Sequence, residues 1–125
     1  MQFPKGSYYQ IISRENGQAL KIQEGDPSKY HKSRIVTAPS NPSDDAQIFM
    51  VDKSVKGDNL YEIVNCASSL VLSEKNGEII LDVGAQKDNQ LFSFEKCTLK
   101  GLDKFYWLKN KSDSNKSISL EGFLR

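Results

Sequence analysis

Few side chains in this chain of 125 residues could take part in chemistry, and one of them is a single imidazole. His31, the only histidine, follows Tyr30 in the polar segment from Asp26 to Arg34. An aromatic ring can stack on the apolar C–H face of a sugar, and an imidazole can donate a hydrogen bond to the hydroxyl rim. The pair therefore predicts a surface platform for a sugar. The alternative is an exposed loop histidine without a specific role.

The same segment also contains three cations, Lys29, Lys32 and Arg34. Charges at the tip of a hairpin are usually solvated and need no partner. A lysine or arginine on an exposed loop would also suit the specificity pocket of a trypsin-like protease, whose buried carboxylate requires a cation. Protease binding through these three residues is therefore an alternative to sugar binding.

The other reactive side chains form no recognisable catalytic or metal-binding arrangement. Cys66 and Cys97 end strands that should be antiparallel neighbours, so the thiols are expected far apart and unbridged. Free thiols are consistent with a reducing compartment. Asp44 and Asp45 are adjacent in a turn and should point apart, which makes them poor partners in acid–base catalysis. We expect no catalytic residues, no metal ligands and no cofactor.

Composition and charge narrow the class of protein. The chain has 38% hydrophobic residues, 26% charged residues and a formal net charge of +1. A chain of this length should form one packed domain, and its balanced charge argues against nucleic-acid binding. No apolar run approaches the roughly 20 residues of a membrane-spanning helix. The start lacks an apolar signal segment, which favours a cytoplasmic protein or one secreted by a non-classical route.

The elements that must position these residues are short β-strands arranged in a repeat. Similar runs begin at Tyr9, Tyr61 and Tyr106, and each is followed by a short apolar alternation. The best-matched pair is 45–53 and 88–96, in which Asp, Gln, an aliphatic residue, Phe, an acid and Lys occupy the same steps. Turn formers such as Asn-Gly and Asp-Pro separate the runs, and no segment has a helical stripe. The pattern predicts an all-β chain.

The third repeat is shorter than the other two. The repeats are expected at about 7–55, 58–98 and 103–125, with four strands in each of the first two and two in the last. A closed threefold barrel would then need roughly 20 further residues. Either the chain is part of a longer protein, or the last unit is rebuilt. A partner chain is one possible source of the strands that complete it. An unpaired edge left by such a gap would favour aggregation unless something covers it.

These units, each closing on Gln-x-aromatic, resemble the β-trefoil and, within it, the ricin B-type lectin family. Residues 6–20 are similar to that family's first strand, turn and second strand, and 47–49 and 90–92 stand in the place of its Gln-x-Trp motif. Phe in place of Trp retains the buried aromatic ring but loses an indole donor. We expect Gln90 to bond nearby backbone and Phe92 to fill the core. The resemblance implies a β-trefoil with a truncated third repeat.

The resemblance also implies which positions would contact a sugar. The family's hydrogen-bonding Asp on the second strand corresponds to Lys21, Val71 and Ser119, and the Asn before the Gln survives only as Asn89. Because these positions are substituted, we expect degenerate sites. The candidate carbohydrate-binding residues are Tyr30, His31, Asp45, Asp82 and Asn89.

The sequence therefore predicts a non-catalytic, lectin-like module whose partners are glycans or glycoproteins. Weak binding at single sites would be strengthened by multivalency in a homo-oligomer or through attached modules. The alternatives are a β-trefoil protease inhibitor acting through residues 26–34 and a protein-interaction module that has lost sugar binding.

Overall fold

The structure, a computed structural model, describes residue 3 and residues 6–13, 16–96, 106–113 and 117–124. Within these residues the protein is all-β, as predicted, and its helical segments are short 3-10 turns. The strands are β1 (Ile11–Ser13), β2 (Ala19–Ile22), β3 (Ile35–Ala38), β4 (Phe49–Lys53), β5 (Tyr61–Asn65), β6 (Val71–Lys75), β7 (Glu78–Asp82), β8 (Phe92–Lys96), β9 (Tyr106–Asn110) and β10 (Ser117–Leu124). The 3-10 turns are η1 (Pro27–Lys29), η2 (Asp45–Gln47), η3 (Asp88–Gln90) and η4 (Lys111–Asp113).

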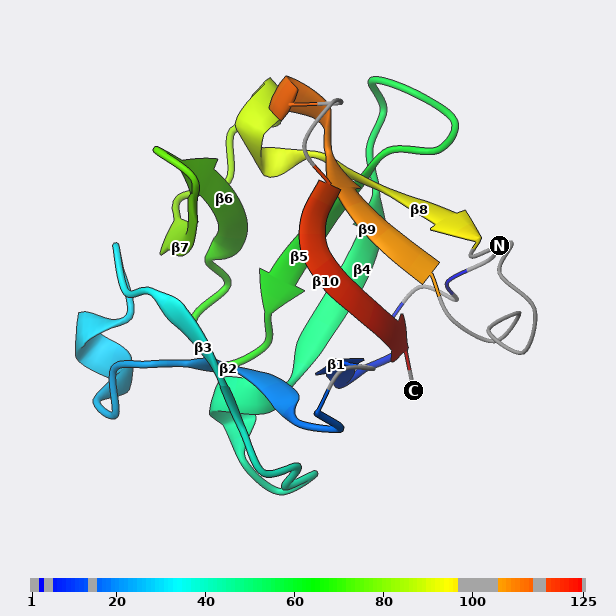
Figure 1. Cartoon of the computed structure of the whole chain (residues 1–125). Coiled ribbons are helices and arrows are strands. Elements are labelled where there is room, and N and C mark those ends of the chain that lie inside the picture. Colours follow the sequence, from blue (N-terminus) through cyan, green and yellow to red (C-terminus); the bar gives the residue numbers. More distant parts are fainter. Residues whose placement is uncertain (1–2, 4–5, 14–15, 97–105, 114–116, 125) are drawn as a thin grey trace.

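Two hairpins, β2–β3 and β6–β7, lie together on one side of the remaining strands (Figure 1). An isolated bridge between Arg34 and Ile80 joins them. The β6–β7 hairpin has the two-residue turn that its Asn-Gly sequence predicts, with φ of 53° at Asn76 and 82° at Gly77. A turn of this kind requires positive φ at both central residues, which Asn and Gly adopt with little strain.

The remaining strands form a closed ring. β4 pairs with β5, β5 with β8, and β8 with β9, while a bridge between Tyr9 and Phe49 joins the segment before β1 to β4. The last strand, β10, completes the ring because it pairs with both β9 and β1 (Figure 1). Its register places Ile11 opposite Leu124 and Lys109 opposite Ser117.

This closure corrects the expectation that the ring would need further residues. The third unit supplies only β9 and β10 among the described residues, so no third hairpin is seen beside the other two. At eight residues, β10 is the longest described strand, and its two ends reach different neighbours. A register shift between Ser117 and Glu121 accompanies this pairing, as expected of a bulge that bends a strand. Within the described residues, the ring is therefore closed by β10 of this chain.

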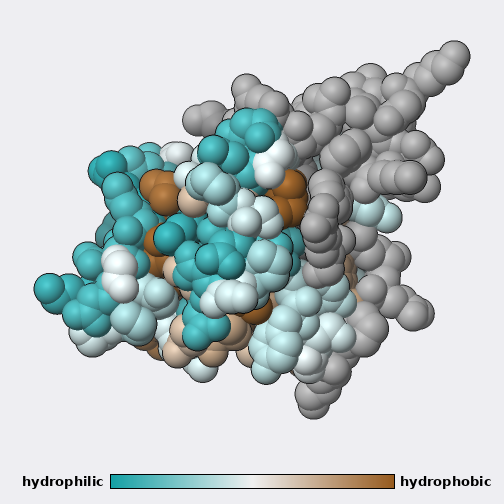
Figure 2. Space-filling view, turned by 90° about the horizontal axis from the view of Figure 1, so that it is seen from below, coloured by the Kyte–Doolittle hydropathy of each residue, from teal (hydrophilic) through white to brown (hydrophobic). Residues whose placement is uncertain are grey.

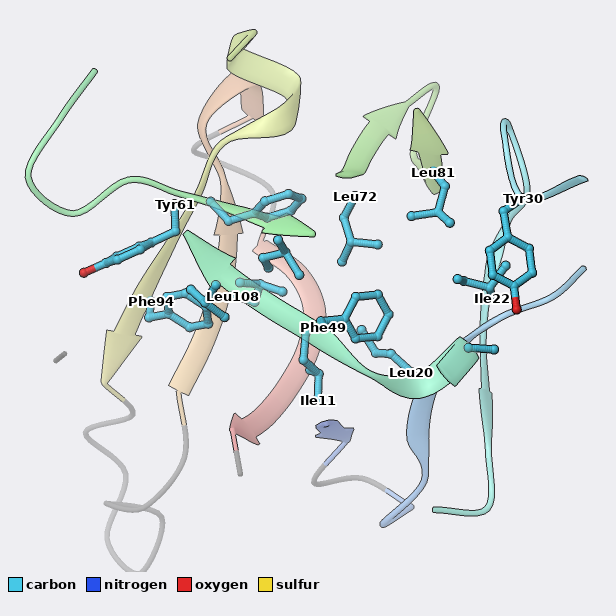
Figure 3. Close-up of a cluster of buried hydrophobic side chains, with 14 residues drawn as sticks. Ile11, Leu20, Ile22, Tyr30, Phe49, Tyr61, Leu72, Leu81, Phe94 and Leu108 are labelled. Carbon is cyan, nitrogen blue, oxygen red and sulfur yellow. The ribbon is translucent and has the colours of Figure 1, made fainter. Parts of the chain in front are cut away.

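The core lies inside this ring and extends beneath the hairpins (Figure 3). Phe49 and Phe92, the aromatic residues of the two Gln-x-Phe motifs, have no exposed surface. Burial of a Phe side chain stabilises a fold by about 1.5–3 kcal/mol. At one end of the core, the rings of Phe3, Tyr61 and Phe94 pack with centroids 4.9–5.7 Å apart. The prediction that Phe92 fills the core is confirmed.

The glutamines of the same motifs hold the loops that precede them. Gln90 donates from Nε2 to the carbonyl of Val83 and accepts at Oε1 from the amide of Ala85, both at 2.8 Å. Gln47 likewise donates to the carbonyl of Pro39 at 3.0 Å and accepts from the amide of Asn41 at 2.9 Å. The prediction that Gln90 bonds nearby backbone is confirmed. The first two units therefore share this hydrogen-bonding pattern as well as the sequence motif.

A second repeated contact was not predicted from the sequence. Asn65, at the end of β5, donates to the carbonyls of Asp45 and Ile48 at 3.0 and 3.2 Å. Asn110, at the end of β9, donates to the carbonyl of Asn89 at 2.9 Å. Each amide thus ties one unit to the 3-10 turn of the unit before it. Both side chains are buried, so these bonds are well shielded from water.

Candidate functional site

The structure brings together His31 and Asp82, two of the predicted site residues. Nε2 of His31 lies 2.8 Å from Oδ1 of Asp82, and Nζ of Lys32 lies 2.8 Å from Oδ2. The amide of Val83 also donates to Oδ1 at 2.8 Å. The hydrogen bond from Lys32, followed by those from Val83 and His31, holds the pKa of Asp82 well below its usual range. We call His31, Lys32 and Asp82 the inter-hairpin cluster.

Backbone bonds hold the inter-hairpin cluster in place. The amide of Lys32 donates to the carbonyl of Leu81 at 2.7 Å, and the amide of Leu81 donates to the carbonyl of Ser33 at 2.9 Å. Lys32 adopts φ of 69°, a left-handed conformation that turns the chain towards β7. Both carboxylate oxygens of Asp82 already accept bonds from the protein, so this cluster joins two hairpins and offers few free acceptors to a ligand.

Tyr30 does not form the surface platform predicted with His31. Its side chain is only 4% exposed and lies in the core beside Ile22 (Figure 3). Burial, followed by the charges of Asp44 and Asp45, raises the pKa of its hydroxyl. The prediction of an exposed Tyr30 ring is therefore wrong. The physical reason is that the loop after η1 turns back towards β7, which places the aromatic ring under the loop instead of above it.

Asn89 takes part in the joint between the second and third units. Its side-chain amide donates to the carbonyl of Glu74 at 3.0 Å, and its own carbonyl accepts from Asn110. Asn89 therefore has a structural role, and it lies apart from the inter-hairpin cluster. The position where the family carries its hydrogen-bonding Asp is also occupied by an internal contact, because Lys21 forms an ion pair with Asp44 at 3.0 Å.

Asp45 lies in a different place, on the wall of a pocket of about 650 Å³. The pocket lies between the segment before β1, η2 and the turn that joins β5 to β6. We call it the Tyr8 pocket, and its lining residues are Tyr8, Tyr9, Gln10, Pro42, Asp45, Ile48, Cys66 and Ala67. Among the predicted candidates, Asp45 is the one that this pocket contains.

The walls of the Tyr8 pocket are fixed by backbone pairing. Tyr9 exchanges two hydrogen bonds with Phe49, at 2.8 and 2.9 Å, which hold the N-terminal segment against η2. The amide of Cys66 donates to the carbonyl of Ile48 at 3.2 Å and holds the opposite wall. Tyr9 packs against Phe3 at the edge of the core, whereas its neighbour Tyr8 is 61% exposed. The result is an exposed aromatic side chain on a rigid frame.

The carboxylate of Asp45 is free within the part of the chain that the structure describes. Its backbone carbonyl accepts from Asn65, but its side chain has no hydrogen bond or ion pair to another described residue. Its neighbour Asp44 differs, because a hydrogen bond from Lys21 lowers the pKa of that carboxyl. Burial raises the pKa of the Cys66 thiol, and the charge of Asp45 raises it further. The pocket therefore combines an exposed phenol with an uncompensated negative charge.

Tyr8 and Tyr9 line the pocket but were not predicted as site residues. Strand alternation does not identify them, because Gln10 and Ile12, which have the same parity as Tyr8, are buried like Ile11. Cys66 is a free thiol as predicted. Cys97, the other cysteine, lies outside the described residues. Of the protease-binding alternatives, Lys32 is bound to Asp82 and Arg34 pairs with Glu78 at 3.3 Å, while Lys29 is exposed on η1.

Other features of the described residues bear on the kind of ligand. The described part of the face shown in Figure 2 is mainly hydrophilic, and its hydrophobic areas are small and separate. No group of three metal-ligating side chains occurs among the described residues. Within the same residues, no helix has both the length and the apolar character required to cross a membrane.

Comparison with known proteins identifies the fold as a β-trefoil. The designed threefold-symmetric protein ThreeFoil superimposes with a TM-score of 0.72 at 19% identity, over 94% of this chain and 85% of that one. SeviL, solved bound to asialo-GM1 saccharide, gives 0.67 at 24% identity, over 94% and 95%. The exo-β-1,3-galactanase 1,3Gal43A from Clostridium thermocellum gives 0.72 at 19% identity, over 88% of this chain and 23% of that one.

The sequence also matches a family description, "Ricin-type beta-trefoil lectin domain-like", over residues 2–86. The chain belongs to this family, and the predicted resemblance is confirmed. A comparison with curated proteins gave no match. The structural likenesses, all below 25% identity, show a shared fold.

Proposed function

We propose that the protein is a non-catalytic carbohydrate-binding module that holds a saccharide in the Tyr8 pocket. The observation that carries this proposal is the exposed ring of Tyr8 on the same pocket as the free carboxylate of Asp45. A sugar can stack its apolar face on an aromatic ring and donate hydrogen bonds from its hydroxyls to a carboxylate, and Tyr8 and Asp45 provide these two partners. The lectin-like family membership supports the same conclusion.

The pocket suits binding better than hydrolysis. Glycosidases generally use a pair of carboxyl groups about 5–10 Å apart, one on each side of the scissile bond. The lining of the Tyr8 pocket includes one carboxylate, Asp45. Its neighbour Asp44 is engaged by Lys21. With one free carboxylate among the described lining residues, the pocket can orient a saccharide, but it has no matched acid and base.

The protease-inhibitor alternative has less support from the geometry. An inhibitory cation must extend into the specificity pocket of the protease, where a buried carboxylate binds it. Lys32 and Arg34 are instead held by Asp82 and Glu78 on the neighbouring hairpin. Lys29 is the remaining exposed cation of the predicted set.

The test is glycan binding by the wild-type protein and two variants of Tyr8. Binding to a printed array of neutral and charged oligosaccharides is measured first, and the strongest ligand is then titrated by calorimetry. Tyr8→Ala should weaken binding roughly 3- to 10-fold, since an aromatic contact contributes about 0.5–1.5 kcal/mol. Tyr8→Phe, which keeps the ring, should bind within about twofold of wild type.

Tyr8→Ala is expected to fold like the wild-type protein, because most of the Tyr8 side chain is exposed. Val83→Ala is a control at an exposed apolar residue outside the pocket lining. Equal affinity of the wild-type protein and Tyr8→Ala for the titrated glycan would show that saccharide is bound elsewhere. Failure of the wild-type protein to bind any glycan would refute the proposed function.

A further inference from the structure

We propose that the Tyr8 pocket selects uncharged saccharides, and that Asp45 is the residue that excludes saccharides carrying carboxylate or sulfate groups. This inference rests on the proposed function and concerns the ligand class of the same pocket. A site intended for anionic glycans would be expected to present a lysine or arginine, because charge-assisted bonds bind carboxylate and sulfate groups strongly. The charged residue that lines this pocket is an aspartate.

The position of Asp45 makes its charge effective at the pocket. Its carbonyl accepts hydrogen bonds from the side chain of Asn65 at 3.0 Å and from the amide of Ile48 at 3.3 Å, which fix the backbone of η2. Asp44 begins the same turn, because its carboxylate accepts from the amide of Ala46 at 3.0 Å. The carboxylate of Asp45 is therefore attached to a rigid segment of the wall.

Among the described residues, the neighbouring charges do not cancel that of Asp45. Lys21, on β2, is engaged by the adjacent Asp44 at 3.0 Å. Cys66 and Asp45 line the same pocket, and burial, followed by the charge of Asp45, raises the pKa of the Cys66 thiol. Its described lining is otherwise uncharged. Over such short distances, screening by physiological salt is incomplete, because the Debye length is about 8 Å.

The same carboxylate attracts neutral sugars. An ionised carboxylate is an acceptor with two oxygens, and sugar hydroxyls are donors. A glycan that carries its own anion near these oxygens meets a like charge, which disfavours binding. Asp45 would thus contribute affinity for the hydroxyls of a neutral sugar and oppose an acidic one. We expect a preference of about tenfold for a neutral glycan over its acidic counterpart at low salt.

The experiment compares neutral glycans with counterparts that carry an added anionic group. Lactose is paired with 3′-sialyllactose and with 6′-sulfated lactose, and the array supplies the same pairs on N-acetyllactosamine. Binding is measured for the wild-type protein, Asp45→Asn and Asp58→Asn. Asn keeps the size and one acceptor of Asp but removes the charge. Asp58→Asn changes the net charge equally at an exposed position of the β4–β5 loop, outside the pocket lining.

The expected result is a roughly tenfold neutral preference in the wild-type protein and in Asp58→Asn, reduced to below about threefold in Asp45→Asn. Higher salt should also reduce the preference in the wild-type protein. Equal binding of neutral and acidic partners by the wild-type protein would overturn the inference while leaving the proposed function intact. An unchanged preference in Asp45→Asn would overturn the role of this residue. Absence of binding to every glycan would overturn the proposed function and the inference together.

Discussion

Removal of the Gln90 side chain should destabilise the protein far more than removal of an exposed glutamine. Gln90 is only 3% exposed, and its amide makes two bonds of 2.8 Å, to the carbonyl of Val83 and from the amide of Ala85. A hydrogen bond contributes a net 0.5–1.5 kcal/mol in general, and each abandoned partner adds a desolvation penalty. Gln90→Ala should therefore lower the free energy of unfolding by about 2–4 kcal/mol.

The assay is urea unfolding followed by fluorescence at neutral pH, with Gln23→Ala as the matched control. Gln23 is exposed and directly follows β2, so its variant should remain within about 0.5 kcal/mol of wild type. A loss of 2–4 kcal/mol should also lower Tm by roughly 8–15 °C for a domain of this size. Equal stability of Gln90→Ala and Gln23→Ala would refute the structural role assigned to the repeated glutamine.

A second variant, Gln90→Glu, tests the direction of the hydrogen bonds. An ionised carboxylate at this position can accept from Ala85 but cannot donate to the carbonyl of Val83, so it should be less stable than Gln90→Ala at neutral pH. Burial should raise the folded-state pKa of the new carboxyl above its unfolded value of about 4.3. The protonated form can donate, so stability should recover as the pH falls through the raised pKa. A pH profile identical to that of Gln90→Ala would contradict this reasoning.

Two further changes test the inter-hairpin cluster and the core. Asp82→Asn should cost about 1–2 kcal/mol at neutral pH. Bonds from Lys32, Val83 and His31 lower the folded-state pKa of Asp82. Its contribution to stability is therefore present above an unfolded pKa of about 3.9 and is lost as the pH falls towards the folded value. Urea unfolding between about pH 7 and pH 2 should show the free energies of unfolding of the two proteins converging, and a constant difference would contradict the account. Phe92→Ala should cost about 3–5 kcal/mol because it empties a fully buried site; a loss below about 1 kcal/mol in the same assay would contradict the core assignment.

The repeat could be predicted because its consequences are local. Gln90 ends η3 and Phe92 begins β8, and the Gln-x-Phe motif that contains both is repeated at 47–49. This short motif predicts the hydrogen-bonding glutamine and the buried aromatic residue together. The Asn-Gly turn of β6–β7 follows from the positive φ that those residues tolerate. The family match over residues 2–86 includes this turn and ends before Gln90 and Phe92.

Closure of the ring could not be predicted, because it depends on a long-range choice of partner. The alternation at 118–120 indicates a strand, but not which strands lie beside it. In the structure β10 pairs with both β9 and β1, and so takes the position that closes the ring. Strand pairing depends on the competing edges that the whole fold provides, which a single segment does not encode.

The candidate site was predicted only in part, for a similar reason. Tyr30 and His31 are neighbours in sequence, but the turn at Lys32 buries the first and exposes the second. Asp45 became a pocket residue because pairing between Tyr9 and Phe49 placed the N-terminal segment beside η2. Composition and spacing could identify polar and aromatic candidates, but the loop path decided which of them share a surface.

The most direct test of the central claim is chemical-shift mapping of a neutral glycan on the isotope-labelled protein. Titration with the strongest neutral ligand from the array should shift backbone amides of Tyr8, Tyr9, Gln10, Asp45 and Cys66, which line one pocket. The amide chemical shifts of His31 and Asp82 should not change. Shifts confined to His31 and Asp82, or to the hairpin strands that carry them, would contradict the account.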